Sequence, residues 1–420
     1  MLALSSVILS LVLSAFAAPT PNALFRRIST RNVKSLKTAD GFFDHQKAIR
    51  QVAYDHNKYR SNLINMRDNV GAEAFKDGAQ ILPPVSPLVS PSEGKGTEKL
   101  NDEHHELWAG IVGVGTPQQS FNVDFDTGSA DLWIPSANCT ATDCAQKAKY
   151  HPEQSSTSQR QGDKFAGIRY QDGSTASGPI FTDTVTVAGI SVKNQGFAAV
   201  ESMSGELAHR PIDGVLGLGY PALAKMGQTP FINTGRAQGS IPHAEFGLRI
   251  TDTTSELEIG LQTGEHCTDA PEVHPVTGDS GYWQISNGML GRGLHAYAHD
   301  FSAIIDSGTT LIYGPPADVA KFYKSVEGAE LWDESNGLYS FPCDEAPSDA
   351  HFQFDKGWRT ISAENFSFGQ IDETRCIGAI AGLDMGLGNH TWVLGDSFLK
   401  NVYTAFSFEK NEVSFCYPRD

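Results

Sequence analysis

Short apolar runs separated by turn residues mark the chain from about residue 100 onward. Residues 107–115, 121–125 and 183–187 alternate or run apolar between such turns. Runs of this length, bounded in this way, predict β-strands. Helical periodicity is limited mainly to residues 45–54 and to residues 315–330, where a proline opens the segment. The pattern therefore predicts a mainly β protein with few helices.

The first hundred residues differ in composition from the rest of the chain. Residues 2–17 are apolar or Ser and end in a small-residue cleavage pattern, although no Lys or Arg precedes the run. A membrane anchor is the weaker alternative, because the run is short for a span. Residues 68–99 are rich in Gly, Pro and Ser, the composition of an exposed linker. We predict a signal peptide at 1–17 and a removable proregion with its linker at 18–98.

Charge is spread unevenly between these parts. Residues 1–99 hold 13 Lys and Arg against 8 Asp and Glu, and the remaining residues hold 19 against 41. A basic proregion would pair with an acidic body at neutral pH, and acid would weaken the pairing. An acidic surface with an unrelated basic tail would give the same counts, so the split alone does not decide. The net charge of −17 argues against a nucleic-acid partner.

One carboxylate motif occurs twice. Phe125-Asp126-Thr127-Gly128-Ser129 is followed by a Val-Leu-Gly run whose Leu216 lies 90 residues after Asp126. Ile305-Asp306-Ser307-Gly308-Thr309 is followed by a second such run, whose Leu394 lies 88 residues after Asp306. Matched offsets in a chain of 420 residues indicate two similar β-rich lobes, which we place at 99–265 and 266–420.

Two facing lobes would bring Asp126 and Asp306 together, and that arrangement carries chemistry. Like charges at short range cannot both ionise easily, so the pair shares one proton over a range of acidic pH. The ionised member can take a proton from a water between them, while the protonated member hydrogen-bonds a peptide carbonyl. Water then attacks the carbonyl without a covalent enzyme intermediate.

The residues after each aspartate suit this arrangement. The glycine permits a tight loop with its N–H facing the carboxylate. The hydroxyl after the glycine can donate to the carboxylate, and the hydroxyl before it can reach the opposite loop. A single Asp-Thr-Gly would be read as an ordinary turn, but two matched motifs favour a catalytic site. The predicted supporting residues are Thr127, Gly128, Ser129, Ser307, Gly308 and Thr309.

With these motifs, residues 100–420 resemble a pepsin-like aspartic protease precursor, of the kind common among secreted and vacuolar fungal enzymes. The resemblance extends to Asp131–Pro135, Ile212–Gly217, Gly281–Ile285 and Trp392–Asp396. It implies a bilobal pepsin-like fold with a cleft between the lobes, and Asp126 and Asp306 as the catalytic pair. It also implies an acid endopeptidase made as a zymogen, acting on proteins or peptides without metal or cofactor.

A flap over the cleft is implied at residues 170–174. Tyr170, Asp172, Gly173 and Ser174 resemble the tip of the family's hairpin, and Trp133 resembles the partner of its tyrosine. Closing such a hairpin would exclude water and hold the substrate against the aspartates. The alternative is an ordinary hairpin with an exposed aromatic residue.

The resemblance also implies that a proregion lysine occupies the aspartate pair at neutral pH. Lys58, followed by Tyr59, is the candidate, and the alternative is one more surface lysine. The proregion would thus be an intramolecular inhibitor that acid releases.

Six cysteines in a secreted chain indicate disulfides, and spacing alone allows 15 connectivities. The resemblance supports Cys139–Cys144 and Cys343–Cys376. Cys267 and Cys416 depart from the simplest pattern and remain either a third pair or two separate thiols.

Three sequons predict glycans at Asn138, Asn365 and Asn389. Asn138 is the weakest of them, because the next residue is a cysteine predicted to be bridged. We expect a secreted monomer without a membrane anchor, with a vacuolar location as the alternative.

Other classes fit the sequence less well. We find no His-Glu-x-x-His spacing for a metalloprotease and no Gly-x-Ser-x-Gly elbow for a serine hydrolase. A binding protein on the same scaffold would not need both aspartates and their hydroxyl supports. Two-carboxylate glycosidases do not repeat Asp-Thr-Gly and Asp-Ser-Gly in this way. The sequence therefore favours an aspartic endopeptidase.

Overall fold

The computed structural model describes residues 26–32, 36–38, 42–85, 108–140, 142–169, 175–204, 211–251, 255–260, 266–278 and 281–419. The predicted signal peptide and the predicted flap tip, residues 170–174, lie outside these ranges. Within them, no helix has both the length and the apolar character needed to cross a bilayer.

The largest sheet has 14 strands and runs from the first lobe into the strands that join the lobes. Its order is β12-β25-β24-β10-β11-β1-β2-β3-β9-β4-β7-β6-β5, with β8 paired to β6 and a further pairing of β2 with β6. The strands are β1 (Arg26–Asn32), β2 (Trp108–Val114), β3 (Gln119–Asp126), β4 (Leu132–Pro135), β5 (Gln159–Arg169), β6 (Thr175–Val187), β7 (Ile190–Val200), β8 (Ser202–Ser204), β9 (Gly214–Gly217), β10 (Glu245–Arg249), β11 (Ser255–Ile259), β12 (Glu272–Pro275), β24 (Tyr403–Ser407) and β25 (Glu412–Cys416).

Two smaller sheets form the rest of the second lobe. One has seven strands in the order β19-β18-β13-β14-β23-β15-β22, and the other has four in the order β16-β17-β21-β20. Their strands are β13 (Gln284–Arg292), β14 (His295–Ile305), β15 (Ile312–Gly314), β16 (Glu330–Asp333), β17 (Leu338–Pro342), β18 (Ala350–Phe354), β19 (Gly357–Thr360), β20 (Ser367–Gln370), β21 (Arg375–Gly378), β22 (Ile380–Gly382) and β23 (Thr391–Leu394).

Helices are few, as the sequence pattern predicts. The α-helices are α1 (His45–Val70), α3 (Phe231–Gln238), α4 (Pro316–Tyr323), α5 (Ala363–Phe366) and α6 (Asp396–Leu399). The 3₁₀ turns are η1 (Ala72–Ala74), η2 (Thr142–Cys144), η3 (Pro152–Gln154), η4 (Pro221–Leu223) and η6 (Cys343–Glu345).

The two aspartate motifs sit in the same local topology. In the first lobe, β3 runs parallel to β9, so that Phe125 pairs with Leu216, and β4 runs antiparallel to β9. In the second lobe, β14 runs parallel to β23, so that Ile305 pairs with Leu394, and β15 runs antiparallel to β23. The Val-Leu-Gly runs thus lie beside the strands that lead into the aspartates, which accounts for the matched offsets in the sequence.

Those leading strands end inside the core. Phe125 and Ile305 are fully buried, and both belong to one large apolar cluster that spans the two lobes. Strands flanked by parallel neighbours are covered on both faces and become apolar without alternation. The aspartate that ends each run is therefore carried on a rigid, buried strand.

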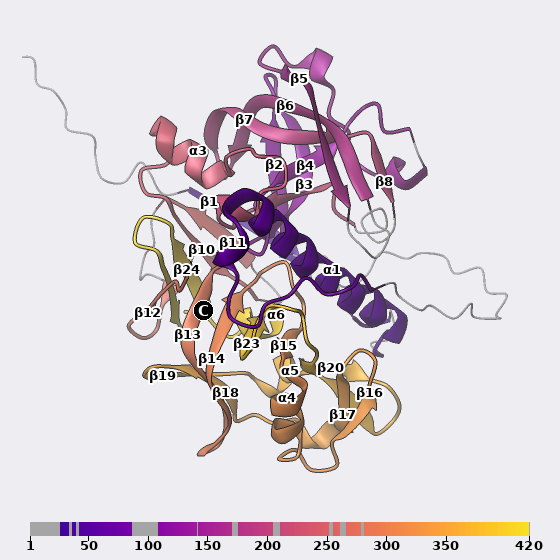
Figure 1. Cartoon of the computed structure of the whole chain (residues 1–420), viewed down its shortest axis with the longest axis vertical. Helices are drawn as coiled ribbons and strands as arrows, with labels where there is room; N and C mark the ends of the chain where they lie inside the picture. The colour runs from indigo at the N-terminus through magenta and orange to yellow at the C-terminus, as the bar shows by residue number, and fades with distance from the viewer. Residues whose placement is uncertain are drawn as a thin grey trace, which may run out of the picture.

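Helix α1 crosses the middle of the molecule. Asp44 caps its start by accepting the Lys47 N–H at 3.0 Å, and Gly71, with φ of 97°, ends it. Figure 1 shows α1, in indigo, between the magenta strands of the first lobe and the orange and yellow strands of the second. The helix continues well past the predicted 45–54 segment, because its buried face extends to Met66.

Two further predictions of local structure need correction. The helix expected over 315–330 ends at Tyr323, and Gly328 then takes a left-handed φ of 67° before β16 begins. The expected linker from residue 68 onward is not loose in its described part. Residues 68–70 complete α1, and residues 71–85 are docked on the body, as in the hydrogen bond of the Gln80 N–H to the Gly386 carbonyl (2.9 Å).

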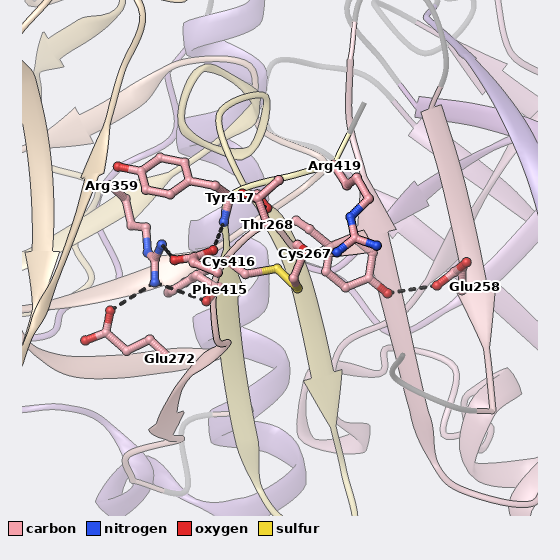
Figure 2. Close-up of a disulfide and its surroundings, with 11 residues drawn as sticks. Glu258, Cys267, Thr268, Glu272, Arg359, Phe415, Cys416, Tyr417 and Arg419 are labelled. Atoms are coloured by element: carbon pink, nitrogen blue, oxygen red, sulfur yellow. Dashed lines mark hydrogen bonds and ion pairs between the residues drawn. A yellow bond between two sulfur atoms is a disulfide. The ribbon is translucent and has the colours of Figure 1, made fainter. Parts of the chain in front are cut away.

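Three disulfides join all six cysteines, as Cys139–Cys144, Cys267–Cys416 and Cys343–Cys376. The structure thus pairs the two cysteines that the sequence left open. Figure 2 shows Cys267–Cys416 beside Arg359, whose guanidinium lies 2.8 Å from Asp269 Oδ2 and donates to the Phe415 carbonyl at 3.2 Å. The Cys267–Cys416 disulfide ties the segment before β12 to the end of β25.

Candidate active site

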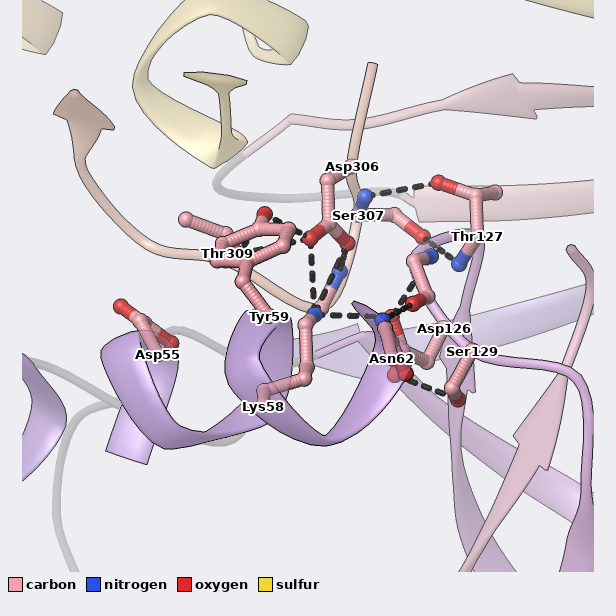
Figure 3. A network of polar contacts seen from close by, with 12 residues as sticks. Asp55, Lys58, Tyr59, Asn62, Asp126, Thr127, Ser129, Asp306, Ser307 and Thr309 are labelled. Atoms are coloured by element: carbon pink, nitrogen blue, oxygen red, sulfur yellow. Dashed lines mark hydrogen bonds and ion pairs between the residues drawn. The ribbon is translucent and has the colours of Figure 1, made fainter. Parts of the chain in front are cut away.

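The structure brings Asp126 and Asp306 together around one cation. Lys58 Nζ lies 3.1 Å from Asp126 Oδ1, and 3.0 Å and 2.8 Å from the two carboxylate oxygens of Asp306. Figure 3 shows the two aspartates approaching the lysine from the two lobes, with α1 below them. Asp126 is 3% exposed and Asp306 is fully buried, so the group of charges is shielded from water.

Each loop holds its own aspartate in the same way. The Gly128 N–H donates to Asp126 Oδ1 and the Gly308 N–H donates to Asp306 Oδ1, both at 2.9 Å. The Ser129 hydroxyl donates to Asp126 Oδ2 at 2.6 Å, and the Thr309 hydroxyl donates to Asp306 Oδ2 at 2.8 Å. These are the contacts that the residue types in the motif suggested.

Thr127 and Ser307 bind across to the opposite loop. The Thr127 hydroxyl donates to the Ile305 carbonyl at 2.9 Å, and the Ser307 hydroxyl donates to the Phe125 carbonyl at 2.7 Å. Each hydroxyl also accepts the backbone N–H of the other residue, at 2.9 Å and 3.1 Å. The four bonds form a reciprocal clasp that fixes the distance between the lobes at the site.

Both glycines are required by the close approach of the loops. A Cβ on Gly128 would lie 2.4 Å from Asp306 Oδ2, and a Cβ on Gly308 would lie 2.1 Å from Asp126 Oδ1. Any larger residue would push the opposite carboxylate away. The glycine in each motif therefore serves the aspartate of the other lobe as well as its own.

The two carboxyl groups differ in their electrostatics. Burial raises the pKa of Asp126, and the charge on Asp306 adds to the rise, while Lys58 opposes it. Burial alone would also raise the pKa of Asp306, but Lys58 and a hydrogen bond from Tyr59 outweigh it and hold this pKa below its ordinary value. In the precursor the pKa of Asp306 is therefore held below that of Asp126.

Tyr59 is a contact that the sequence did not assign. Its hydroxyl donates to Asp306 Oδ2 in a short hydrogen bond and lies 2.9 Å from the Thr309 hydroxyl. Burial raises the pKa of Tyr59, and the Asp306 charge adds to the effect. The tyrosine therefore stays a neutral donor. Its position next to Lys58 in the sequence was the available signal.

A row of asparagines on α1 was also missed. Asn62 donates to the Gly128 carbonyl at 2.6 Å, and Asn65 donates to the Leu223 carbonyl at 3.0 Å. Asn69 donates to the Ala222 and Ala224 carbonyls at 2.9 Å and 2.8 Å. Asparagines three or four residues apart lie on one helix face, and that spacing could have identified them. They fasten α1 to the first lobe with bonds that do not titrate.

Comparison with known proteins gives the family. Residues 107–417 match the family model described as eukaryotic aspartyl protease. The chain belongs to the eukaryotic aspartyl protease family. It is therefore an aspartic-type endopeptidase, a hydrolase that acts on peptide bonds, and its fold is the mainly β, bilobal fold that the sequence predicted.

Several relatives support this placement. An aspartic protease of Phaffia rhodozyma is 36% identical over 329 residues, covering 76% of this chain and 78% of the relative. Major aspartyl peptidase 1 of Cryptococcus neoformans is 30% identical over 441 residues, covering 98% and 87%. Pepsin A of Sus scrofa is 29% identical over 376 residues, covering 88% and 92%.

Of the predicted flap and substrate-binding residues of this aspartyl protease, the structure describes only Trp133. Tyr170, Asp172, Gly173 and Ser174 lie outside the described residues. Trp133 lies on β4 and is 2% exposed, and its indole N–H finds no hydrogen-bond acceptor among the residues that the structure describes.

A possible metal-ligand cluster lies away from the aspartates. Within the described ranges, Glu256, Glu258 and His266 bring their ligand atoms within 4.8 Å of one another. His266 Nε2 already lies 2.7 Å from Glu258 Oε1, and Glu258 also accepts the Tyr403 hydroxyl at 2.9 Å. Both carboxylate oxygens of Glu258 thus have partners within the protein.

Proposed function

We propose that Asp126 and Asp306 are the catalytic pair of this endopeptidase. The observation that carries the proposal is the matched support of two buried carboxyl groups, each held by its glycine N–H and its hydroxyl. The clasp of Thr127 and Ser307 fixes the spacing. Such preorganised donors stabilise a defined ionised state without rearrangement during the reaction.

The chemistry follows once Lys58 leaves. Without the cation, the negative charges of two carboxylates that had been close enough to share one ammonium repel each other. The pair then takes up one proton that both carboxyl groups share. The ionised carboxylate then accepts a proton from a bound water, and that water attacks the peptide carbonyl. The protonated carboxyl donates to the carbonyl oxygen as negative charge develops there. Collapse of the tetrahedral intermediate, with proton transfer to the amine, breaks the peptide bond.

The proregion supplies the inhibition in this proposal. Lys58 occupies the place between the carboxylates, and Tyr59 binds Asp306. Val52, Leu63 and Met66 of the same helix are buried in an apolar cluster that includes residues of both lobes. A helix that fills this position leaves no room there for a substrate. We infer that the described form is the latent precursor.

Acid releases this inhibition through the carboxylates and not through the lysine. Burial would lower the pKa of Lys58, but the two aspartates reverse the effect and raise it, so the lysine is charged throughout the acidic range. The depressed pKa of Asp306 means that its contribution to docking is present above the ordinary aspartate pKa and is lost as pH falls through the lowered value. Asp126, with its raised pKa, protonates first.

The wider organisation is part of the same proposal. A signal peptide at 1–17 directs secretion, with the vacuole as the alternative destination, and residues 18–98 are removed from a body made of lobes 99–265 and 266–420. Tyr170, Asp172, Gly173 and Ser174 form a flap that closes over the substrate, with Trp133 as the partner of Tyr170. The buried, unpaired indole N–H of Trp133, within the described part of the chain, supports that pairing. The active protein is a monomer.

One experiment tests the catalytic proposal directly. The purified precursor is acidified in the presence of a denatured protein, with and without a statine-type inhibitor. We expect the chain to shorten and the protein to be hydrolysed, and the inhibitor to block hydrolysis. Hydrolysis that persists in the inhibitor, or in the Asp306→Asn variant, would contradict the proposal.

A further inference from the structure

A turn of the proregion packs against a loop of the second lobe. The turn comprises residues 76–80, and the loop comprises residues 384–391. The Asn389 N–H donates to the Asp77 carbonyl at 3.0 Å. A Cβ on Gly78 would lie 2.5 Å from Asn389 Cγ, so the proregion backbone touches the side chain of this asparagine. Asn389 therefore stands where the proregion meets the body.

Asn389 also begins the sequon Asn389-His390-Thr391. Its side chain is exposed, so the side-chain amide nitrogen is accessible for modification. A sugar attached there would stand next to Gly78 of the proregion, where a Cβ would lie 2.7 Å from the side-chain nitrogen. The sequon lies in the loop just before β23, where the backbone turns at His390 with φ of 52°.

The other two sequons are less suited to carry a sugar. Asn138 Nδ2 donates to Glu201 Oε1 at 2.9 Å, and its middle residue, Cys139, is in a disulfide. Asn365 is half-buried, and its Nδ2 donates to Asn401 Oδ1 at 2.9 Å. A glycan on either nitrogen would have to share or replace that bond. The geometry therefore ranks Asn389 first.

A cavity of 220 Å³ lies beside Asn389. The proregion closes one side of it with Gly78 and Gln80, and the second lobe supplies the rest. Polar and apolar groups share the lining, as a sugar requires, since its hydroxyls need partners and its ring faces are apolar. The second-lobe residues that line the cavity include Tyr313, Pro315, Asp384, His390 and Thr391.

We propose that Asn389 carries an N-linked glycan whose proximal N-acetylglucosamine occupies this cavity and holds the proregion turn on the second lobe. In the attachment step, the amide nitrogen bonds to C1 of the sugar of a lipid-diphosphate oligosaccharide donor. The lipid diphosphate leaves with the C1–O electrons, and the amide gives up one proton. This inference rests on the proposed precursor function and adds a second hold on the proregion, remote from the aspartates.

The first test measures occupancy. The full-length precursor is secreted from a yeast host, trimmed with an endoglycosidase that leaves one sugar, digested, and analysed by mass spectrometry. We expect the peptide that contains Asn389 to carry one N-acetylhexosamine and the peptide that contains Asn138 to be unmodified. An unmodified Asn389 in the secreted precursor would overturn the inference.

The second test measures the hold on the proregion. Thr391→Ala abolishes the sequon, and the matched control Thr391→Ser keeps it. We expect the Thr391→Ala precursor to shorten roughly two- to tenfold faster at a mildly acidic pH, as expected for the loss of a contact worth about one hydrogen bond. The Thr391→Ser precursor and wild-type precursor trimmed to one sugar should shorten at the untrimmed wild-type rate. Asn389→Gln should match Thr391→Ala, and Asn365→Gln should match wild type.

Two failures can be told apart. Equal conversion rates for Thr391→Ala and Thr391→Ser, with normal shortening of the wild type, would contradict this inference alone. A wild-type precursor that never shortens in acid would contradict the proposed precursor function. Equal peptidase activity of all variants after complete conversion establishes that each has folded.

Discussion

The loop that carries Asp126 and the loop that carries Asp306 have the same frame and different surroundings. Each aspartate accepts a glycine N–H at 2.9 Å and a hydroxyl three residues later, and each loop reaches across to the other. Of the two aspartates, however, Tyr59 binds only Asp306, and only Asp306 is completely buried. The frame comes from the two lobes, whereas the asymmetry comes mainly from the proregion.

This difference separates catalysis from latency. A symmetric frame lets either carboxyl group hold the shared proton, which suits a reaction in which a proton moves between them. The asymmetric contacts lower the pKa of Asp306 while that of Asp126 is raised, so they favour the negative charge on Asp306 as long as the proregion is bound. We expect the asymmetry to fall when the proregion leaves, and the following variants test that expectation in order of expected effect.

The largest effect should come from the aspartates themselves. We expect Asp126→Asn and Asp306→Asn each to lower kcat/KM by at least about 10³-fold, because general acid–base transfer is lost. Each variant is converted in trans by tagged wild-type enzyme that is then removed, and peptide hydrolysis is measured at acidic pH. Similar losses support the equivalence of the two loops. A variant that keeps most of its activity would show that one carboxyl group is dispensable.

Next in size is the loss of the shared cation. Lys58→Met leaves two buried carboxyl groups without their shared cation and should weaken proregion docking by about 3–5 kcal/mol. The pH at which the precursor shortens should therefore rise, because the weakened proregion is released after fewer carboxylates have been protonated. Lys47→Met is the control, because Lys47 is an exposed residue of the same helix that pairs with Asp44 at 3.6 Å. An unchanged conversion pH in Lys58→Met would refute the role of the lysine.

A smaller effect in the same direction is expected from Tyr59→Phe. The change removes one donor to a charged carboxylate, a contact worth about 1.5–3 kcal/mol, and leaves the ring in place. The precursor should shorten at a pH between those of wild type and Lys58→Met. After conversion, the pH profile of kcat/KM should equal that of wild type, because Tyr59 leaves with the proregion. A changed profile in the converted enzyme would contradict this assignment.

The smallest effect should come from the supporting hydroxyls, and it compares the two loops in the active enzyme. Ser129→Ala and Thr309→Val each remove a hydrogen bond that favours an ionised carboxylate, so the pKa of the pair should rise by about half to one unit. The acid limb of the kcat/KM profile, where an ionised aspartate is needed, then moves to higher pH. Ser129→Thr keeps a hydroxyl and should behave as wild type.

The size of the two shifts is itself informative. Equal shifts in Ser129→Ala and Thr309→Val would show that the pair is symmetric once the proregion has left. A larger shift in Thr309→Val would show that the body alone already favours charge on Asp306. No shift in either variant would refute the role of the hydroxyls.

Much of the fold and the site could be predicted from local sequence. The strands before Asp126 and Asp306 are apolar runs, and the Val-Leu-Gly echoes lie beside them as parallel neighbours. Lys58 lies at the aspartates, as the family resemblance implied. These predictions succeed because a strand that is buried and paired on both sides requires apolar residues, which can be recognised in the sequence.

Other features were under-predicted because they depend on distant partners. The apolar positions Val52, Tyr59, Leu63 and Met66 continue a helical period along α1, whereas the sequence analysis placed helical periodicity only at residues 45–54. Those asparagines are buried because carbonyl groups of the first lobe accept their amides. In the same way, Cys267 lies 149 residues from Cys416, and no local pattern could pair them.

By itself, the sequence determined that two aspartates sit at the ends of matched buried strands. The strand that leads into each motif and the Val-Leu-Gly run that follows it consist mainly of the apolar residues that a buried, paired strand requires. Only the tertiary structure decided how those aspartates are charged. Asp126 and Asp306 carry nearly the same neighbours in sequence, yet their pKa values move in opposite directions. The reason is that burial, a shared ammonium and one tyrosine hydroxyl act through space, on atoms that folding brings together from a helix far away in the chain.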